Sequence, residues 1–175
     1  MNRNIYFLII FTFLLSACGT KPSENIQNEI SQFDLKGFFD KEASRLQAKN
    51  PTVTKTVSIN GEAETKNLTI EEWKKELEIF SSADINKADW KGEFKKSVEG
   101  NKEIYTTNNP KILVKKLVII NGEKTKEIEV VISKQNLVYA SSDTLKYIPD
   151  SLYEIKKVQK IKLLDPRKYL IRVEF

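Results

Sequence analysis

From residue 103 onward, apolar and polar residues alternate with a period of two, and this pattern favours an antiparallel sheet. A period of two places successive side chains on opposite faces of a strand. In the last stretch, Ile171 and Val173 fall on one face, whereas Arg172 and Glu174 fall on the other. One face of such a sheet is buried and the other is in contact with water. The predicted strands are residues 103–107, 111–120, 124–133, 136–141, 144–148, 152–163 and 168–175.

Three pairs of turn residues divide the strand-like stretches into hairpins. Asn60-Gly61 separates residues 52–59 from residues 63–68, and Asn121-Gly122 separates two of the later stretches. Asn-Gly is a strong hairpin signal because a tight turn needs positive φ at both central residues. Asp165-Pro166 supplies the third turn, since proline suits the first corner of a turn. We expect residues 52–59 and 63–68 to pair, and the last two stretches to form the C-terminal edge of the meander.

Two helices are predicted before the meander. Residues 26–48 carry apolar side chains at spacings of three and four, which is typical of an amphipathic helix, and Asn50-Pro51 ends it. A second helix is expected after Thr69, because Thr69 and Glu72 can form a capping box. The buried stripe of this second helix consists of Trp73, Leu77 and Phe80.

The predicted fold class is α+β, with two N-terminal helices packed on the concave face of a curved antiparallel β-meander that can form an open half-barrel. The order of elements loosely resembles that of the periplasmic lipoprotein-carrier proteins. Two segments, "WKKELEIFSSADINKADWKG" and "NLVYASSDTLKYIPDSLYEIKKVQKIKLLD", are similar to small uncharacterised lipoproteins of Bacteroidetes-type bacteria. The resemblance to these small lipoproteins spans most of the chain after its first 17 residues and implies no known activity.

The beginning of the chain combines a basic residue, an apolar run and the single cysteine. Arg3 precedes residues 5–15, a run too short for a comfortable membrane span, which needs about 20 apolar residues. The following "LLSACG" resembles the lipobox of bacterial lipoproteins. The resemblance implies cleavage between Ala17 and Cys18 and acylation of Cys18, including a further chain such as palmitate. Several acyl chains meet the requirement for stable anchoring. An uncleaved signal anchor with an incidental cysteine is the alternative.

The chain divides into three segments. Residues 1–17 are predicted to be a lipoprotein signal peptide, residues 18–28 the acylated cysteine and its tether, and residues 29–175 a single α+β domain. No aspartate follows Cys18 directly, and in lipoproteins of the enteric type an aspartate there retains the protein in the inner membrane. The resemblance therefore implies a lipid-anchored protein of the cell envelope, more specifically of the outer membrane, facing the periplasm.

Composition excludes several classes of enzyme. The chain has no histidine, and its one cysteine is committed to the anchor. Ser-His-Asp and Cys-His catalysis and histidine-based zinc sites are therefore excluded, which leaves a Ser-Lys pair or two carboxylates. The 29 basic and 24 acidic residues give a net charge of +5, which is too weak and too mixed to predict a nucleic-acid partner.

The aromatic residues of the helical region are candidates for a ligand site. They either line an apolar cup against the sheet or pack as ordinary core. The cup would consist of Trp73, Phe80, Trp90 and Phe94. Asp84, Asn86 and Asp89 lack the alternating register of a calcium loop, so neither a metal nor a cofactor is predicted. Ser141-Ser142-Asp143 is interpreted as a turn.

These features predict a membrane-anchored envelope lipoprotein with a non-catalytic binding or assembly role. Its partners would be the lipid bilayer, reached through acylated Cys18, and either an apolar ligand or an envelope protein. The alternative is a carboxylate-based hydrolase of the cell envelope. A glycosidase-like site of that kind needs two Asp or Glu side chains about 5–10 Å apart in a cleft.

Overall fold

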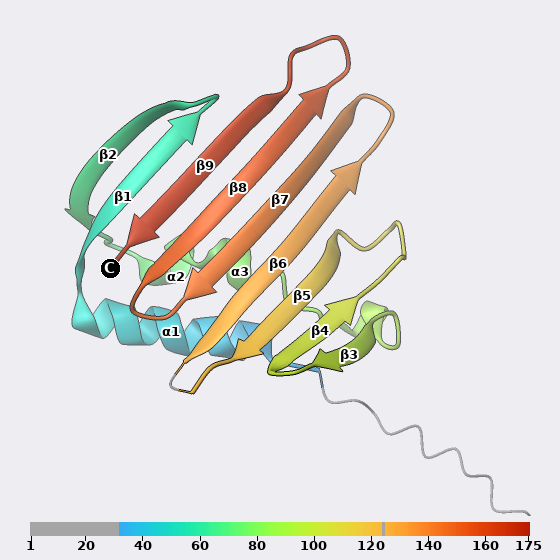
Figure 1. Cartoon of the computed structure of the whole chain (residues 1–175), viewed down its shortest axis with the longest axis horizontal. Coiled ribbons are helices and arrows are strands. Elements are labelled where there is room, and N and C mark those ends of the chain that lie inside the picture. Colours follow the sequence, from blue (N-terminus) through green and yellow to red (C-terminus); the bar gives the residue numbers. More distant parts are fainter. Residues whose placement is uncertain (1–31, 124) are drawn as a thin grey trace, which may run out of the picture. The chain divides into compact units, whose positions relative to one another are not determined.

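The computed structural model describes residues 32–123 and 125–175, which form one large sheet with a helical layer on one face (Figure 1). The predicted signal peptide, Ala17, Cys18 and the tether lie outside the described residues. The helical elements are α1 (Leu35–Lys49), α2 (Trp73–Glu76), α3 (Glu78–Ser81) and the 3₁₀ turn η2 (Ala88–Trp90). The strands are β1 (Thr52–Ile59), β2 (Glu62–Thr69), β3 (Lys95–Glu99), β4 (Lys102–Thr106), β5 (Val114–Asn121), β6 (Lys126–Gln135), β7 (Tyr139–Ile148), β8 (Leu152–Ile161) and β9 (Arg167–Glu174).

The nine strands lie in the order β2-β1-β9-β8-β7-β6-β5-β4-β3, and all neighbouring pairs are antiparallel. Strands β3 to β9 form a continuous meander. The β1–β2 hairpin, which comes first in the chain, extends the meander because β1 pairs with β9, with Val57 opposite Ile171. The predicted last hairpin is confirmed by the pairing of β8 with β9, but it is not an edge of the sheet, since β9 lies between β8 and β1 (Figure 1).

The Asn60-Gly61 turn both closes the first hairpin and fastens it to β9. Asn60 and Gly61 adopt positive φ values of 52° and 99°, as a two-residue hairpin turn requires. The predicted pairing of residues 52–59 with residues 63–68 is confirmed by the register of β1 and β2. In addition, Asn60 Oδ1 accepts a hydrogen bond from the Lys168 N–H at 2.8 Å, and the Asn60 N–H donates to the Lys168 carbonyl at 2.8 Å.

Helix α1 is defined by capping interactions at both ends. The Gly37 N–H donates to the side chain of Asp34 at 2.8 Å, which satisfies one of the free donors at the helix start. Asn50 adopts a left-handed φ of 44°, and its N–H donates to the Leu46 carbonyl at 2.8 Å. The face turned to the sheet is buried and consists of Leu35, Phe39, Ala43 and Leu46.

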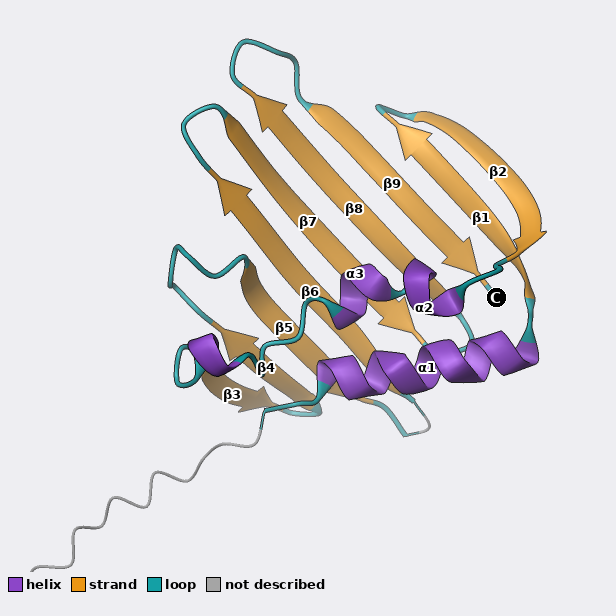
Figure 2. Cartoon of the chain, turned by 180° about the vertical axis from the view of Figure 1, so that it is seen from behind, coloured by secondary structure: helices purple, strands orange, loops and turns teal. Residues whose placement is uncertain are grey.

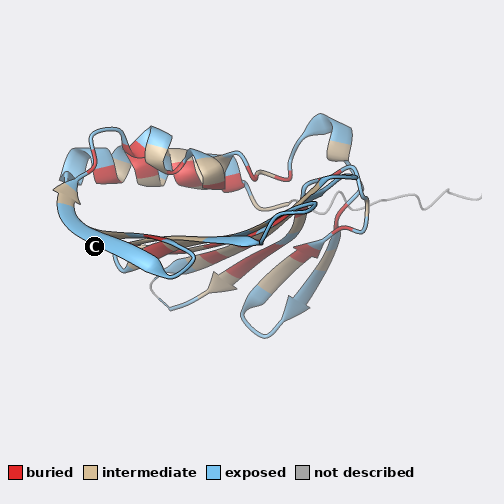
Figure 3. Cartoon of the chain, turned by 90° about the horizontal axis from the view of Figure 1, so that it is seen from above, coloured by how far each residue is buried: buried red, intermediate tan, exposed pale blue. Residues whose placement is uncertain are grey.

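The core lies between the helical layer and the part of the sheet that it covers (Figures 2 and 3). Phe39 and Phe80 stack with ring centroids 4.9 Å apart, and Tyr147 meets both rings edge-on. Trp73 stacks on Phe175 with centroids 5.7 Å apart. Paired aromatic rings of this kind bury a large apolar area, so the α1, α2 and α3 segments are held mainly by ring contacts.

The predicted α+β fold, with two N-terminal helices on a meander able to form an open half-barrel, is wrong. Half of the described residues belong to the strands of one nine-stranded sheet, and only 18% are helical. The first helix begins at Leu35, and residues 26–31 lie outside the described residues. The second is reduced to the single turns α2 and α3. Thr69 cannot cap it, because Thr69 ends β2 and pairs with Thr52.

Candidate ligand groove

A groove of about 840 Å³ lies between the chain from α2 to η2 and the face of the sheet that carries the helices, here called the inner face. Alternate residues of neighbouring strands point to the same side, so the floor combines apolar side chains with the charged Asp143 and Lys157. The floor includes Ile132 of β6, Ile155 of β8 and Ile171 of β9, and the opposite wall includes Ile79, Ala83 and Trp90. We name this feature the sheet groove.

The groove exists because the helical segments cover only one end of the long strands (Figure 2). Tyr153 of β8 lies under the helices and is fully buried, whereas Ile155, two residues further along, is only partly buried. On β1, Val57 and Ile59 face the same side and are 41% and 49% exposed. The inner face therefore carries apolar surface that neither the core nor the helices cover, and such concave apolar surface is where ligands bind.

Asp143 is the most unusual polar residue of the groove. It lies on β7 opposite Ile132 of β6 and Lys157 of β8, and it is only 8% exposed. Asp143 Oδ2 lies 3.4 Å from Lys157 Nζ, whereas Asp143 Oδ1 has no hydrogen-bond partner. The groove thus contains an ion pair with one open acceptor site.

Charged side chains border the groove on the helical side. Lys87 Nζ lies 4.2 Å from the centroid of the Trp90 ring and 3.3 Å from the Ser82 carbonyl, to which it donates. Glu76 accepts hydrogen bonds from the Tyr153 hydroxyl and from Lys55, the latter at 2.7 Å. Burial, reinforced by the hydrogen bond to Glu76, raises the pKa of Tyr153 far above its ordinary value. Glu76 therefore already has two donors.

The four residues of the predicted cup do not line one site. Trp73 and Phe80 are fully buried in the core, where their neighbours are Phe175 and Phe39. Trp90 lines the sheet groove. Phe94 is 8% exposed and its ring lies 6.3 Å from that of Trp90. Of the four, only Trp90 is therefore placed where a ligand in the groove can contact it.

Sequence reasoning missed Asp143 because it interpreted Ser141-Ser142-Asp143 as a turn. The structure instead runs β7 without interruption from Tyr139 to Ile148. The signal available in the sequence is that Asp143 keeps a period of two with Leu145 and Tyr147, and the structure buries all three. The period of two continues through the polar residues of β7, so the carboxylate of Asp143 lies on the buried face of the sheet.

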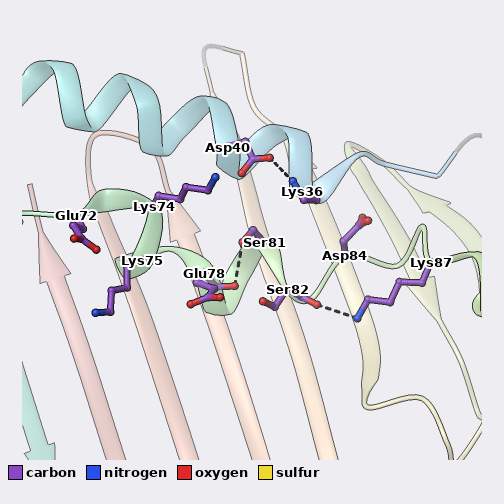
Figure 4. A pocket seen from close by; sticks show the side chains of 10 residues that line it. All are labelled: Lys36, Asp40, Glu72, Lys74, Lys75, Glu78, Ser81, Ser82, Asp84 and Lys87. Atoms are coloured by element: carbon purple, nitrogen blue, oxygen red, sulfur yellow. Dashed lines mark hydrogen bonds and ion pairs between the residues drawn. The ribbon is translucent and has the colours of Figure 1, made fainter.

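A second, polar depression of about 720 Å³ lies on the outer side of the helical layer (Figure 4). Its side chains are of mixed charge, and Asp40 is paired with Lys36 at 2.6 Å. The hydrogen bond from Lys36 lowers the pKa of Asp40. A general acid needs a carboxyl with a raised pKa, so this depression has the character of a solvated charged surface.

The chain matches no protein-family model, no curated protein and no solved structure. Within residues 32–123 and 125–175, no helix combines the length and the hydropathy needed to cross a membrane. In the same residues, no group of three or more Asp, Glu or Cys side chains is placed to hold a metal ion. The sheet groove and the N-terminal sequence are therefore the two features of the chain that bear on its function.

Proposed function

We propose that this protein is a lipid-anchored lipoprotein of the bacterial cell envelope that binds an apolar ligand in the sheet groove and catalyses no reaction. The observation that supports the binding role best is the partly uncovered inner face of the sheet. Ile132, Ile155 and Ile171 come from three different strands, lie together on the floor of the groove and are only partly buried. A volume of about 840 Å³ suits a ligand of lipid-like or drug-like size.

The anchor is proposed from the sequence. The apolar run, the small residues Ser16 and Ala17 and the sole cysteine Cys18 follow one another in the order of a lipobox. Acylated Cys18 would hold the domain at the outer membrane, facing the periplasm. The ligand would then be encountered next to the membrane, which is where apolar molecules concentrate.

The alternative function, a carboxylate-based hydrolase, is less well supported. Glu76 already accepts hydrogen bonds from Tyr153 and Lys55. Wherever the pKa of a carboxyl among the described residues departs clearly from its ordinary value, it is lowered, whereas a general acid needs a raised value. The four carboxyls concerned are Asp40, Glu64, Glu103 and Asp150. A binding role needs no such group.

The proposal is tested by binding of diphenylhexatriene, a hydrocarbon that fluoresces in apolar surroundings. The mature chain, residues 18–175, is used with Cys18→Ser so that its own lipid does not compete. We expect saturable fluorescence. Trp90→Ala should weaken binding about tenfold, since it removes one apolar wall at a loss of roughly 1.4 kcal/mol.

Leu137→Ala is the matched control for Trp90→Ala. Leu137 is also apolar, but it is 95% exposed, lies in the loop between β6 and β7 and does not line the groove. Its truncation should leave probe binding unchanged. The proposal fails if the parent chain gives no saturable signal, or if Trp90→Ala and Leu137→Ala alter binding to the same extent.

A further inference from the structure

Two buried side-chain atoms of the described residues lack a hydrogen-bond partner, and one of them points to the chemistry of a ligand. They are Trp73 Nε1 and Asp143 Oδ1. Trp73 lies in the closed core, whereas Asp143 lines the sheet groove. A buried carboxylate oxygen that stays unpaired is costly, and such groups in native proteins call for a specific explanation. Because Asp143 lines the groove, a hydrogen-bond donor on a bound ligand would explain why its Oδ1 has no partner within the protein.

The neighbouring lysine satisfies only one side of the carboxylate. Lys157 faces Asp143 across the β7–β8 ladder, and its Nζ lies 3.4 Å from Oδ2. The Lys157 side chain is 35% exposed, whereas that of Asp143 is 11% exposed. The ammonium therefore keeps contact with the open part of the groove, while Oδ1 is buried and has no partner. A group that lies beside the ion pair finds an acceptor in Asp143 and a donor in Lys157.

The ion pair selects against charged ligands. A cation that approaches Asp143 is repelled by Lys157 at nearly the same distance, and an anion that approaches Lys157 is repelled by Asp143. An uncharged group that donates one hydrogen bond and accepts another meets neither repulsion. Hydroxyl and amide groups have this property.

We infer that the ligand of the sheet groove is an apolar chain that carries an uncharged hydroxyl or amide group, and that Asp143 Oδ1 accepts its hydrogen bond. This inference rests on the proposed function. The apolar chain lies along Ile132, Ile155 and Ile171, which flank the ion pair on the floor. The polar group lies beside the ion pair of Asp143 and Lys157. Asp143 is thus the residue that determines specificity, whereas the isoleucines supply affinity without selecting the polar group.

The test compares ligands that differ only in this polar group. 1-Decanol and its isomer 1-methoxynonane contain the same atoms, but only the alcohol can donate a hydrogen bond. Each displaces diphenylhexatriene from the mature chain carrying Cys18→Ser. We expect 1-decanol to bind about tenfold more tightly than the ether, and more tightly than decanoate or decylammonium. N-butylhexanamide, which is also uncharged and donates through an N–H, distinguishes an amide ligand from an alcohol.

Two variants test whether the ion pair causes the preference for 1-decanol over the ether and the charged ligands. Asp143→Leu should bind alcohol and ether equally, because it lacks the acceptor. Lys157→Met leaves the Asp143 carboxylate without its cation, so decylammonium should gain at least tenfold relative to 1-decanol. Lys156→Met is the matched control, since Lys156 is the next residue of β8, is exposed and faces away from the groove. It should leave all of these affinities unchanged.

The outcomes separate this inference from the proposed function. If the probe does not bind, the proposed function fails and the inference fails with it. If the probe binds but alcohol and ether displace it equally, or if a charged ligand binds most tightly to the parent chain, the groove binds apolar molecules and the inference alone is wrong. The ligand comparison on the parent chain needs no substitution in the groove, so misfolding of Asp143→Leu would not obscure the result.

Discussion

The hydroxyl of Tyr147 on β7 donates a hydrogen bond to Glu42 of α1, with 2.7 Å between Oη and Oε2. Arg45, one turn further along the helix, holds the same carboxylate at 2.9 Å. The Tyr153 hydroxyl donates to Glu76 of α2 in the same manner. Each of two buried tyrosines of the sheet therefore fixes one helical segment through a charged acceptor, and the position of α2 in turn sets one wall of the sheet groove.

Tyr147→Phe should lower the free energy of unfolding by about 1–3 kcal/mol, the usual range for a hydrogen bond to a charged group. The phenylalanine ring keeps the edge-on contacts with Phe39 and Phe80, so the loss reports the hydroxyl. Urea unfolding at pH 7 measures it. Tyr169→Phe is the control, because Tyr169 is only partly buried at the groove and should lose less than about 0.5 kcal/mol. Equal losses would contradict the role given to Glu42.

The same tyrosines predict a loss of stability at high pH. Burial, followed by the hydrogen bond to Glu42, raises the pKa of Tyr147, and burial together with Glu76 raises that of Tyr153. Both groups hold their protons more tightly in the folded state than in the unfolded state, where the pKa is about 10. Their stabilisation is complete below that pH and is lost above it. The free energy of unfolding should fall with rising pH above pH 10, with a slope that approaches about 1.4 kcal/mol per pH unit for each tyrosine as the unfolded tyrosine becomes fully deprotonated.

A comparison of variants isolates the tyrosine contribution, because lysines in ion pairs also titrate near this pH. Between pH 10 and 11, the decline of stability in Tyr147→Phe should be shallower by the contribution of one tyrosine, about 1 kcal/mol over that interval, because the unfolded tyrosine is only partly deprotonated there. Urea unfolding at a series of pH values gives both slopes. Parallel slopes for the parent and Tyr147→Phe would show that Tyr147 does not titrate differently in the two states.

Phe175→Ala tests the contact between β9 and α2. Phe175 is partly buried, stacks on Trp73 at 5.7 Å and meets Tyr153 at 6.5 Å. Truncation should cost roughly 2–4 kcal/mol, close to the usual range for a buried aromatic residue. Lys162→Ala, at an exposed turn position, should cost less than about 0.5 kcal/mol. Thermal unfolding of the two variants decides the matter, and equal midpoints would mean that the ring does not support the core.

The features of the fold that could be predicted from the sequence are those with a local cause. Asn60-Gly61 determines its own turn, and the pairing of β1 with β2 follows from it. The burial of Trp73, Leu77 and Phe80 was also predicted correctly, although the helix expected around them is only two single turns. Apolar spacing therefore identified which side chains are buried better than it identified the element that carries them.

The remainder depends on contacts between distant parts of the chain. Val57 and Ile171 pair across the β1–β9 ladder, and no turn or spacing near either residue specifies the other. The sheet groove depends on how far the helical segments extend over the strands, and long-range contacts such as the stacking of Trp73 on Phe175 help to hold those segments in place. Asp143 was misread because a polar Ser-Ser-Asp run is typical of a turn. In the structure, pairing with Ile132 of β6 and Lys157 of β8 holds Asp143 in the sheet.

Cys18→Ser tests the proposed anchor. Serine offers no thiolate to form the thioether, so the variant should lose metabolic labelling with palmitate and should no longer fractionate with membranes as the parent does. Ser16→Ala is the control, because it keeps a small residue at the corresponding position of the lipobox, and its labelling should match that of the parent chain. If Cys18→Ser still incorporates fatty acid and sediments with membranes, the lipobox interpretation is wrong. The proposed ligand groove would still stand in that case, but for a protein with a different cellular location, because the contact between Asp143 and Lys157 does not depend on the anchor.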